Sequence, residues 1–316
     1  MNASHGTHCR SRVVRSALPL ALALPLVASP TGEQDPCERS AVETLKSCRN
    51  EAQSDFWLAR AKCSNLPTKG ERTDCVLDAL EEMEDAFEEC REQRDARLDV
   101  CDALGGGIYH PLIDPKDFVE VIDNPYLPLL PGTHFIYEKE IDEGTERVDL
   151  FVTDQTKEIL GVECVAVHDI ESLDDEVVED TIDWFAQDAH GNVWYFGEIS
   201  ISFEDGEIES LDGSWQAGRD GAKPGIIMRA DPEEGDFYRQ EFLIGEAEDV
   251  AEVLSLSAMV KVHYGAFERC LQTEESSPLE PGGFEHKFYA AGVGLVLELD
   301  PESGERLELI DVVLED

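Results

Sequence analysis

The sequence has little positive charge. Lys and Arg number 25 against 70 Asp and Glu in 316 residues, and the formal net charge is -45 at pH 7. A chain this acidic repels nucleic-acid phosphates and anionic lipid headgroups, which excludes nucleic-acid binding and docking on a membrane surface as leading functions. Hydrophobic residues are not scarce, at 42% of the chain. The composition therefore predicts a folded acidic protein rather than a disordered chain.

The sequence also lacks the signatures of common catalytic sites. It contains no Gly-x-Ser-x-Gly elbow, no His-Glu-x-x-His motif and no Asp-x-Asp-x-Asp-Gly calcium loop. The glycine-containing segment 218–223 differs in spacing from a phosphate-binding loop. We therefore expect a non-catalytic protein without a cofactor. An enzyme whose site matches no known motif is the alternative.

Long apolar runs are absent except near the N-terminus. Arg10, Arg12 and Arg15 precede an apolar stretch over 17–28 that ends in Leu-Val-Ala. This pattern is typical of a secretory signal peptide, here 1–28, and the stretch is too short to span a bilayer as a helix. We expect an exported protein, periplasmic or extracellular, with no membrane span in the mature chain. An uncleaved anchor is the alternative.

Six of the cysteines follow a palindromic spacing. Their separations are 11, 15, 12, 15 and 11 residues, so three nested pairs share a midpoint at Lys69. An antiparallel helical hairpin brings such positions together, whereas cysteines 11 residues apart on one helix lie roughly 16 Å apart, beyond disulfide reach. The spacing therefore predicts three disulfides: Cys37–Cys101, Cys48–Cys90 and Cys63–Cys75.

The same segment predicts the two helices of a coiled-coil hairpin over 29–104. Apolar residues recur at steps of three and four beside the cysteines, and Thr68 with Glu71 indicates a capping box for the second helix. The hairpin loosely resembles coiled-coil-helix disulfide hairpins, and a rigid arm of this kind is suited to docking a protein partner. A cysteine-rich metal cluster is the alternative, although metal ligands are usually more closely spaced.

Glycines at 105–107 predict a hinge over 105–109, and the remainder, 110–316, predicts an antiparallel β domain. The fold class is therefore α+β. Many acids alternate with apolar residues along the expected strands, Asp169 and Asp183 among them, and we interpret them as the solvent-facing side of the sheet. The segment 246–256 is expected to be helical. Strands are expected near 133–140, 146–154, 162–170, 176–187, 192–203, 237–244, 259–264, 266–273, 284–291, 293–299 and 305–313.

Three segments of the β domain resemble a family of uncharacterised bacterial exported proteins. They are the Leu-Pro-Leu-Leu-Pro-Gly-Thr run that opens 127–138, Gly-Asn-Val-Trp-Tyr-Phe-Gly-Glu at 191–198, and His-Lys-Phe-Tyr-Ala-Ala-Gly-Val-Gly within 285–296. More distantly, the chain resembles LolA-like periplasmic half-barrel proteins. The half-barrel resemblance implies a curved antiparallel sheet around an apolar cargo or a helix, and the family resemblance covers residues 110–300. It supplies no catalytic residues.

Two further cysteines lie in the β domain. In an oxidising compartment Cys164 and Cys270 are expected to form a disulfide. A copper or zinc site that includes His168 is one alternative, and unpaired thiols are another.

A glycine-rich segment over 213–228 carries a tryptophan and two cations inside an acidic domain. Long loops are disproportionately functional, so we interpret it as a lid or recognition loop that meets an anionic group, or as a loop that neutralises surface acids. The candidate ligand-binding residues are Trp184, Trp194, Trp215, Arg219, Lys223, Met228 and His286.

The leading hypothesis is an exported, non-catalytic binding protein whose β domain holds a small apolar or amphiphilic ligand. The alternatives are a structural protein whose hairpin docks a partner, and a protein that binds copper, zinc or calcium.

Overall fold

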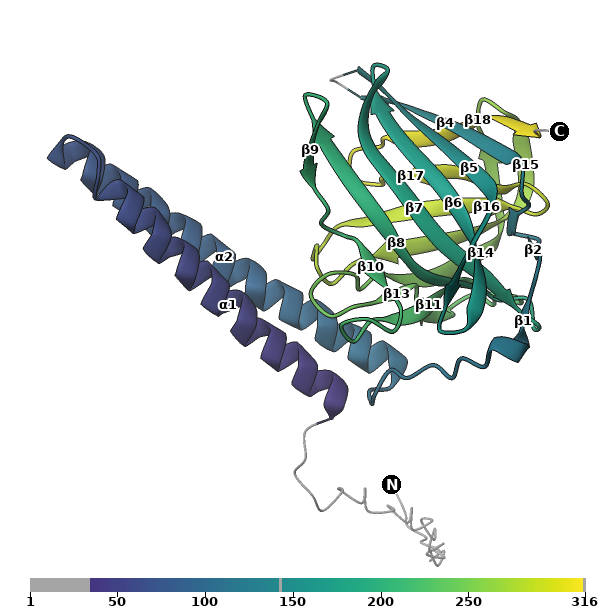
Figure 1. Ribbon diagram of the computed structural model, residues 1–316, viewed down its shortest axis with the longest axis horizontal. Coiled ribbons are helices and arrows are strands. Elements are labelled where there is room, and N and C mark those ends of the chain that lie inside the picture. The colour runs from purple at the N-terminus through teal and green to yellow at the C-terminus, as the bar shows by residue number, and fades with distance from the viewer. Residues whose placement is uncertain (1–34, 142–143, 315–316) are drawn as a thin grey trace, which may run out of the picture. The chain divides into compact units, whose positions relative to one another are not determined.

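The computed structural model describes residues 35–141 and 144–314. The signal peptide predicted at 1–28 lies outside these residues. The described chain has two α-helices followed by a mostly antiparallel, nearly closed sheet, so the predicted α+β class is confirmed (Figure 1). Within the described part of the chain, no helix is both long enough and apolar enough to cross a membrane.

The helical hairpin consists of α1 (Pro36–Cys63) and α2 (Lys69–Leu104). The carboxylate of Asp35 accepts a hydrogen bond from the Cys37 backbone N–H at the start of α1. Thr68 and Glu71 form the predicted capping box at the start of α2. Gly105 caps the C-terminus of α2; its φ of 79° is in the left-handed region that glycine permits.

Three disulfides join α1 and α2 in the pairing that the spacing predicts, Cys37–Cys101, Cys48–Cys90 and Cys63–Cys75. The paired Cα atoms lie 5.6 to 5.8 Å apart. Apart from cysteines, few hairpin residues are buried; Ala41 and Ala79 are two of them. Cross-links that restrict the unfolded chain therefore supply stability that so small an apolar interface does not.

The β domain is built from one large sheet and a short ribbon. Among the described residues, sixteen strands join in the order β12-β14-β15-β16-β17-β18-β4-β5-β6-β7-β8-β11-β13, with β1 beside β7, and β9 and β10 beside β8. β2 and β3 form the ribbon, and Pro115–Asp117 forms a 3-10 turn. The strands are β1 (Phe118–Val119), β2 (Ile122–Asn124), β3 (Leu127–Leu129), β4 (Thr133–Ile141), β5 (Gly144–Ile159), β6 (Val162–Leu173), β7 (Glu176–Asp188), β8 (Val193–Glu204), β9 (Glu207–Ser210), β10 (Trp215–Gln216), β11 (Lys223–Met228), β12 (Phe237–Arg239), β13 (Glu241–Phe242), β14 (Val250–Lys261), β15 (Ala266–Ser276), β16 (Phe284–Ala290), β17 (Gly294–Leu299) and β18 (Arg306–Leu314).

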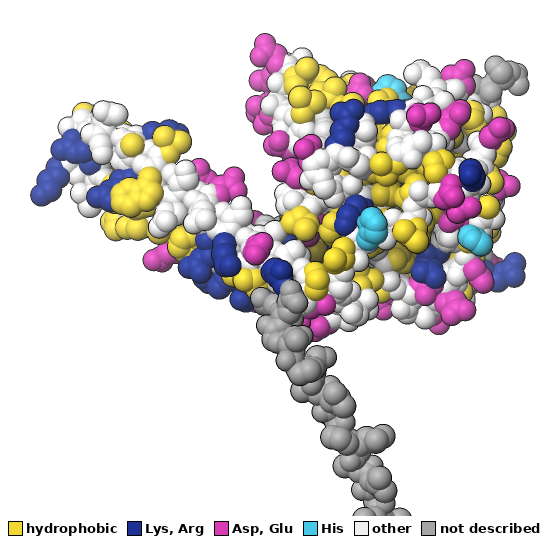
Figure 2. Space-filling view, turned by 60° about the horizontal axis from the view of Figure 1, so that its bottom comes forward, with side chains coloured by type: hydrophobic (Ala, Val, Ile, Leu, Met, Phe, Trp, Pro, Cys, Tyr) yellow, Lys and Arg dark blue, Asp and Glu magenta, His cyan; other side chains and the backbone are white. Residues whose placement is uncertain are grey.

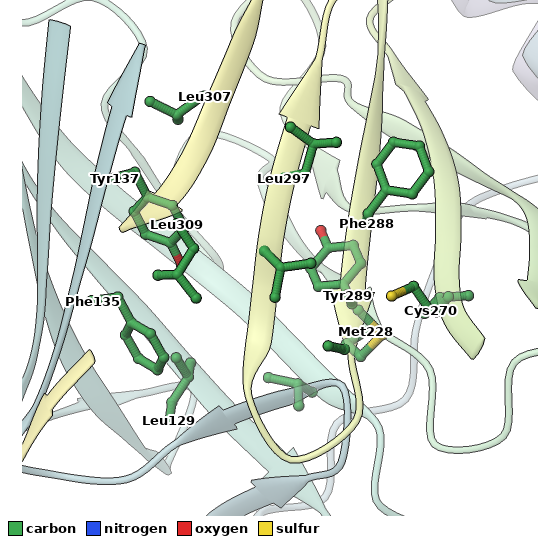
Figure 3. Close-up of a cluster of buried hydrophobic side chains, with 14 of the residues drawn as sticks. Leu129, Phe135, Tyr137, Met228, Cys270, Phe288, Tyr289, Leu297, Leu307 and Leu309 are labelled. Atoms are coloured by element: carbon green, nitrogen blue, oxygen red, sulfur yellow. The ribbon is translucent and has the colours of Figure 1, made fainter. Parts of the chain in front are cut away.

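The larger apolar cluster of the β domain gathers side chains from distant parts of the sequence. Phe135 and Tyr137 from β4 lie near Leu307 and Leu309 from β18, and Tyr289 comes from β16 (Figure 3). β18 pairs with β4, so the last strand of the chain lies beside the first long strand. This pairing is in the middle of the strand order, and the sheet curves until β11 and β12, near its two ends, lie close together.

A second apolar cluster covers the outer face of β6 to β8. Trp184 is 4% exposed and alternates along β7 with Asp183 and Phe185, so it projects from the opposite face. Trp215, from the 213–228 segment, belongs to the same cluster and is also 4% exposed. The Trp215 carbonyl lies where a Cβ on Gly197 would stand, so that position requires glycine. These strands are thus covered on both faces.

Two sequence-based expectations about the β domain are wrong. The segment 246–256 is not helical, because its buried residues Val250, Ala251 and Val253 belong to strand β14, which pairs with β15. Cys164 and Cys270 are both buried and free. They lie on β6 and β15, which are not neighbours in the sheet, and they belong to different apolar clusters.

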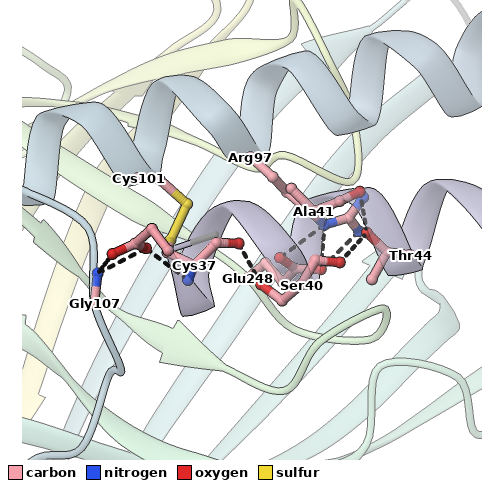
Figure 4. The surroundings of a disulfide bond; sticks show 9 residues. Cys37, Ser40, Ala41, Thr44, Arg97, Cys101, Gly107 and Glu248 are labelled. Atoms are coloured by element: carbon pink, nitrogen blue, oxygen red, sulfur yellow. Dashed lines mark hydrogen bonds and ion pairs between the residues drawn. A yellow bond between two sulfur atoms is a disulfide. The ribbon is translucent and has the colours of Figure 1, made fainter. Parts of the chain in front are cut away.

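A buried ion pair links α2 to the β domain. The guanidinium of Arg97 donates to the carboxylate of Glu248 at 2.7 and 2.9 Å, and the two side chains are 8% and 4% exposed (Figure 4). Glu248 also accepts a hydrogen bond from the Gly245 backbone N–H. Each charge is therefore compensated by the other and by local hydrogen bonds.

We expect Arg97→Met to lower the free energy of unfolding by about 3–5 kcal/mol, because it leaves the Glu248 charge buried without its partner. Urea denaturation followed by tryptophan fluorescence measures this. Arg94→Met is the matched control, since Arg94 pairs with an exposed Asp95 and its loss should cost about 1 kcal/mol or less. The double variant Arg97→Met, Glu248→Met should recover most of the loss, and equal effects of the two single arginine variants would contradict the prediction.

Candidate functional site

A cavity of about 340 Å³ lies inside the curved sheet, and we call it the interior cavity. Its lining comes mainly from β3 to β8 and β15 to β18, so residues far apart in the sequence meet there. The apolar and aromatic lining residues are Leu127, Pro128, Leu129, Phe135, Tyr137, Val148, Leu150, Val167, Phe185, Tyr195, Ile227, Tyr289, Leu295 and Leu307.

The interior cavity changes from polar to apolar along its strands. On β5 the lining residues change from acidic Glu146 to apolar Leu150. On β6, read against the chain direction, they change from acidic Glu171 to apolar Val167. The strands are antiparallel and pair Leu150 with Asp169, so their acidic ends lie at the same end of the sheet. The cavity therefore has an acidic end and an apolar end.

The charged lining of the interior cavity is almost entirely acidic. Lys287 is the one base in the lining, and its Nζ lies 2.8 Å from Glu285 and 3.3 Å from Glu275. Lys139 pairs with Glu146 at 2.9 Å. Among the described residues, the ion pairs give no base to Asp169, Glu171, Asp183 or Glu241. The acids of the lining are Glu146, Asp169, Glu171, Asp183, Glu241, Asp249, Glu275 and Glu298.

Asp183 shares a hydrogen-bonded group with Tyr195 and Glu198. The Tyr195 hydroxyl oxygen lies 2.5 Å from Asp183 Oδ1 and 2.8 Å from Glu198 Oε2. A phenol carries one proton and donates to one of the two, so the contact with the other is favourable when that carboxyl is itself protonated. Burial, followed by repulsion from neighbouring carboxylates, raises the pKa of both Asp183 and Glu198. The group is therefore built to hold a proton near neutral pH.

Two further carboxyls of the cavity titrate near neutral pH. Burial and repulsion from Glu171 raise the pKa of Asp169 from 3.8 to about 8. Burial and repulsion from Glu179 raise the pKa of Glu171 from 4.5 to about 7. A positive charge placed between these groups would reverse both effects, because an opposite charge favours the ionised form.

Two polar atoms of the lining residues are buried without a hydrogen-bond partner among the described residues. They are Asp169 Oδ1, an acceptor, and Gln240 Nε2, a donor. Gln240 is 2% exposed as a whole residue. A buried polar atom without a partner costs about 1–3 kcal/mol, so each of these atoms favours a bound group that supplies the missing partner.

The tryptophans predicted to bind a ligand do not line the interior cavity. Trp184 and Trp215 are buried in the outer apolar cluster, and the Lys157 ammonium lies 3.1 Å from the centroid of the Trp184 ring. Trp194 donates its indole N–H to Asp188 at 2.9 Å and lines a separate surface pocket beside Tyr109. Two of the three therefore serve packing between the sheet and its outer covering.

The other predicted ligand residues are dispersed as well. Arg219 is exposed, the Lys223 ammonium donates to the Tyr109 carbonyl, and Met228 is 1% exposed within the larger apolar cluster. His286 lies 3.3 Å from Glu274 and alternates with Lys287, which faces the cavity. The 213–228 segment is not an open loop, because β10 and β11 within it pair with β8.

The residues considered for a metal site also lie apart. Cys164 and Cys270 are on distant strands, and His168 is four residues along β6 from Cys164, roughly 13 Å in an extended strand. The His168 ring contacts Asp180 at 2.8 Å. Within the described residues, no group of three or more His, Cys, Asp and Glu is arranged to hold a metal ion.

Sequence reasoning assigned Asp169 and Asp183 to the solvent-facing side of the sheet, and this is wrong, because both line the cavity. The pattern does carry a signal for the inner face, since Asp183 and Phe185 share one side of β7. Alternation shows which residues share a face. It does not show which face the closed sheet encloses.

The hairpin exposes apolar side chains that the docking hypothesis would use. Trp57, Leu58 and Leu77 are between 56% and 58% exposed, and Figure 2 shows hydrophobic side chains gathered along the helical arm. Nothing in the described residues indicates what would cover them. Docking of a protein partner by the hairpin stays a prediction.

Comparisons with known proteins give little further information. No family model matches the chain, and no curated protein matches it. A solved structure described as "a putative lipoprotein from Parabacteroides distasonis" is 11% identical and covers 60% of this chain and 99% of its own, with a TM-score of 0.33. A likeness this distant identifies neither a family nor a function. The LolA-like resemblance stays a prediction.

We expect the stability of the protein to fall as pH rises from about 4 to about 8. The folded-state pKa of Asp169 lies above its usual value of 3.8, so over this range the folded state binds more protons than the unfolded state. Asp169→Asn removes this contribution and should raise the free energy of unfolding at pH 8 by on the order of 1–3 kcal/mol, with a smaller gain at pH 5. Urea denaturation at the two pH values measures both.

Glu163→Gln is the matched control for this prediction, because Glu163 lies on the same strand and is exposed. It should leave the pH dependence unchanged. Parallel curves for Asp169→Asn and the unmodified protein would show that Asp169 is not the titrating group.

Proposed function

We propose that this protein is an exported binding protein that holds a small amphiphilic ligand in the interior cavity. The observation that carries the proposal is the combination, in one cavity, of an apolar end with an acidic end that contains buried polar atoms without partners. A purely structural core would be expected to pack the apolar end and to leave no carboxylate in the acidic end.

The size and lining of the cavity support this proposal. Ligand sites are typically concave, of about 300–1,000 Å³, and mostly apolar with a few convergent polar groups. The interior cavity, at about 340 Å³, falls at the small end of this range. An amphiphile with a short apolar tail would fill the end near Leu129 and Phe135, which lie side by side in Figure 3, and would place its polar head among the carboxylates.

The disulfides support the export part of the proposal. Three disulfides in a small helical unit are typical of proteins that fold in an oxidising compartment outside the cytosol. A binding protein in that setting would hold a ligand that is present outside the cytosol.

We expect Leu150→Trp to abolish ligand binding, because Leu150 lines the cavity and the larger ring would occupy its volume. The probe is N-phenyl-1-naphthylamine, a small aromatic amine whose fluorescence rises in an apolar site. The unmodified protein should bind it with a Kd in the micromolar range, and the variant should bind at least about tenfold more weakly, a loss of about 1.4 kcal/mol or more.

Asp154→Trp is the matched control, since Asp154 is exposed on the same strand and should leave the Kd unchanged. Far-UV circular dichroism of each variant tests that the sheet is intact, and Leu295→Phe provides a smaller cavity-filling change if Leu150→Trp does not fold. Native mass spectrometry of protein purified from its exported form should detect a bound small molecule. Failure of both the probe and the mass measurement would overturn the proposed function.

A further inference from the structure

We propose that the ligand of the interior cavity carries an organic cation, a protonated or quaternary amine, which the carboxylates of Asp169, Glu171 and Asp183 hold. This inference rests on the proposed function, because it names the chemistry of the ligand in the same cavity. It predicts a charge preference that a simple apolar site would not have.

The first argument is the charge of the lining. Lys287 and Lys139 pair with other acids at the acidic end, which leaves Asp169, Glu171 and Asp183 without an ion pair among the described residues. Burial first, and repulsion between neighbouring carboxylates second, raise the pKa values of this cluster. A bound cation offsets the repulsion between the carboxylates, and its attraction to them is stronger in surroundings of low polarity than in water. The acidic chain as a whole also attracts cations to the protein.

The second argument is independent of the acids. Gln240 lines the same cavity, is 98% buried, and its Nε2 has no hydrogen-bond partner among the described residues. An amide N–H donates and cannot be satisfied by a cation. Its missing partner is therefore an acceptor on the ligand, such as a hydroxyl or carbonyl oxygen. A buried donor in this state points to a bound group rather than to a solvated acidic patch.

The aromatic lining favours an organic cation over a metal ion. Phe185 and Tyr195 stack with ring centroids 4.7 Å apart, and both line the cavity beside Asp183. Aromatic faces attract alkylammonium groups and also pack against their methylene groups. No group of three or more His, Cys, Asp and Glu within the described residues has the arrangement of a metal site.

The test compares three probes that share an eight-carbon tail and differ in head charge. They are octylammonium, 1-octanol and octanoate, each titrated into the full exported protein by isothermal calorimetry at pH 8. Octylammonium should bind at least about tenfold more tightly than 1-octanol, and octanoate should bind most weakly. Equal binding of octylammonium and 1-octanol would overturn the cation inference and leave the proposed function standing. Failure of all three, together with failure of N-phenyl-1-naphthylamine, would overturn both.

Variants separate the head group from the tail. Asp169→Asn should weaken octylammonium at least about tenfold and change 1-octanol less than about twofold, because it removes charge without closing the cavity. Glu163→Gln, at the exposed end of the same strand, should change neither. An equal loss for both probes in Asp169→Asn would indicate damage to the cavity and would count against the inference. Displacement of octylammonium by equimolar calcium or zinc would show an inorganic cation site instead.

Proton release gives a further readout. At pH 7 the cluster is partly protonated, so binding a cation should expel protons, and the heat of octylammonium binding should differ between phosphate and Tris buffers. Binding of 1-octanol should show no such difference. Identical heats for octylammonium in both buffers would contradict the inference.

The titratable groups that face the cluster are Tyr137, Lys139, Glu146, Glu179, Tyr195, Glu198, Glu241, Asp249, Glu275, Glu285, Lys287, Tyr289 and Glu298.

Discussion

The desolvation of carboxylates inside a nearly closed sheet is the constraint on which the β domain depends. The sheet curves until β11 and β12, near the two ends of its strand order, lie close together. This encloses the inner face of the strands and places several acids in surroundings that disfavour their charge. Lys287 offsets part of this cost through Glu275 and Glu285, and Tyr195 offsets part at Asp183. The desolvation cost that is not offset at Asp169 gives the site its chemical character.

The outer covering of the sheet explains why Asp183 faces inward. Segment 213–228 packs Trp215 against the outside of β6 to β8, where Trp184 also lies. Because Trp184 and Ala186 of β7 are buried on the outer face, Asp183 of the same strand alternates onto the inner one. A domain with a bare outer face would show the opposite arrangement, and its interior would be wholly apolar.

Charged groups are also buried where α2 meets the β domain, but there each charge has an oppositely charged partner. Arg97 and Glu248 are both nearly inaccessible and form a complete pair. Asp169 is half-buried beside other acids, its Oδ1 atom is inaccessible, and it has no ion pair among the described residues. A matched pair is suited to fixing two elements together, whereas an unmatched cluster is suited to accepting a charge from outside. The protein uses burial of charge in both ways.

The sequence by itself determined the features that depend on local spacing. The palindrome of six cysteines predicted the hairpin and its three disulfides, because helical geometry leaves few residue pairs within bonding distance. Period-two patterns located most strands. The predicted Cys164–Cys270 disulfide and the predicted helix at 246–256 were wrong, because both depend on which strands become neighbours. Only the tertiary structure decided the site. Alternation assigns Asp169 and Asp183 to a face, but closure of the sheet and the packing of segment 213–228 decide which face is inside, and both are set by contacts between residues far apart in the chain.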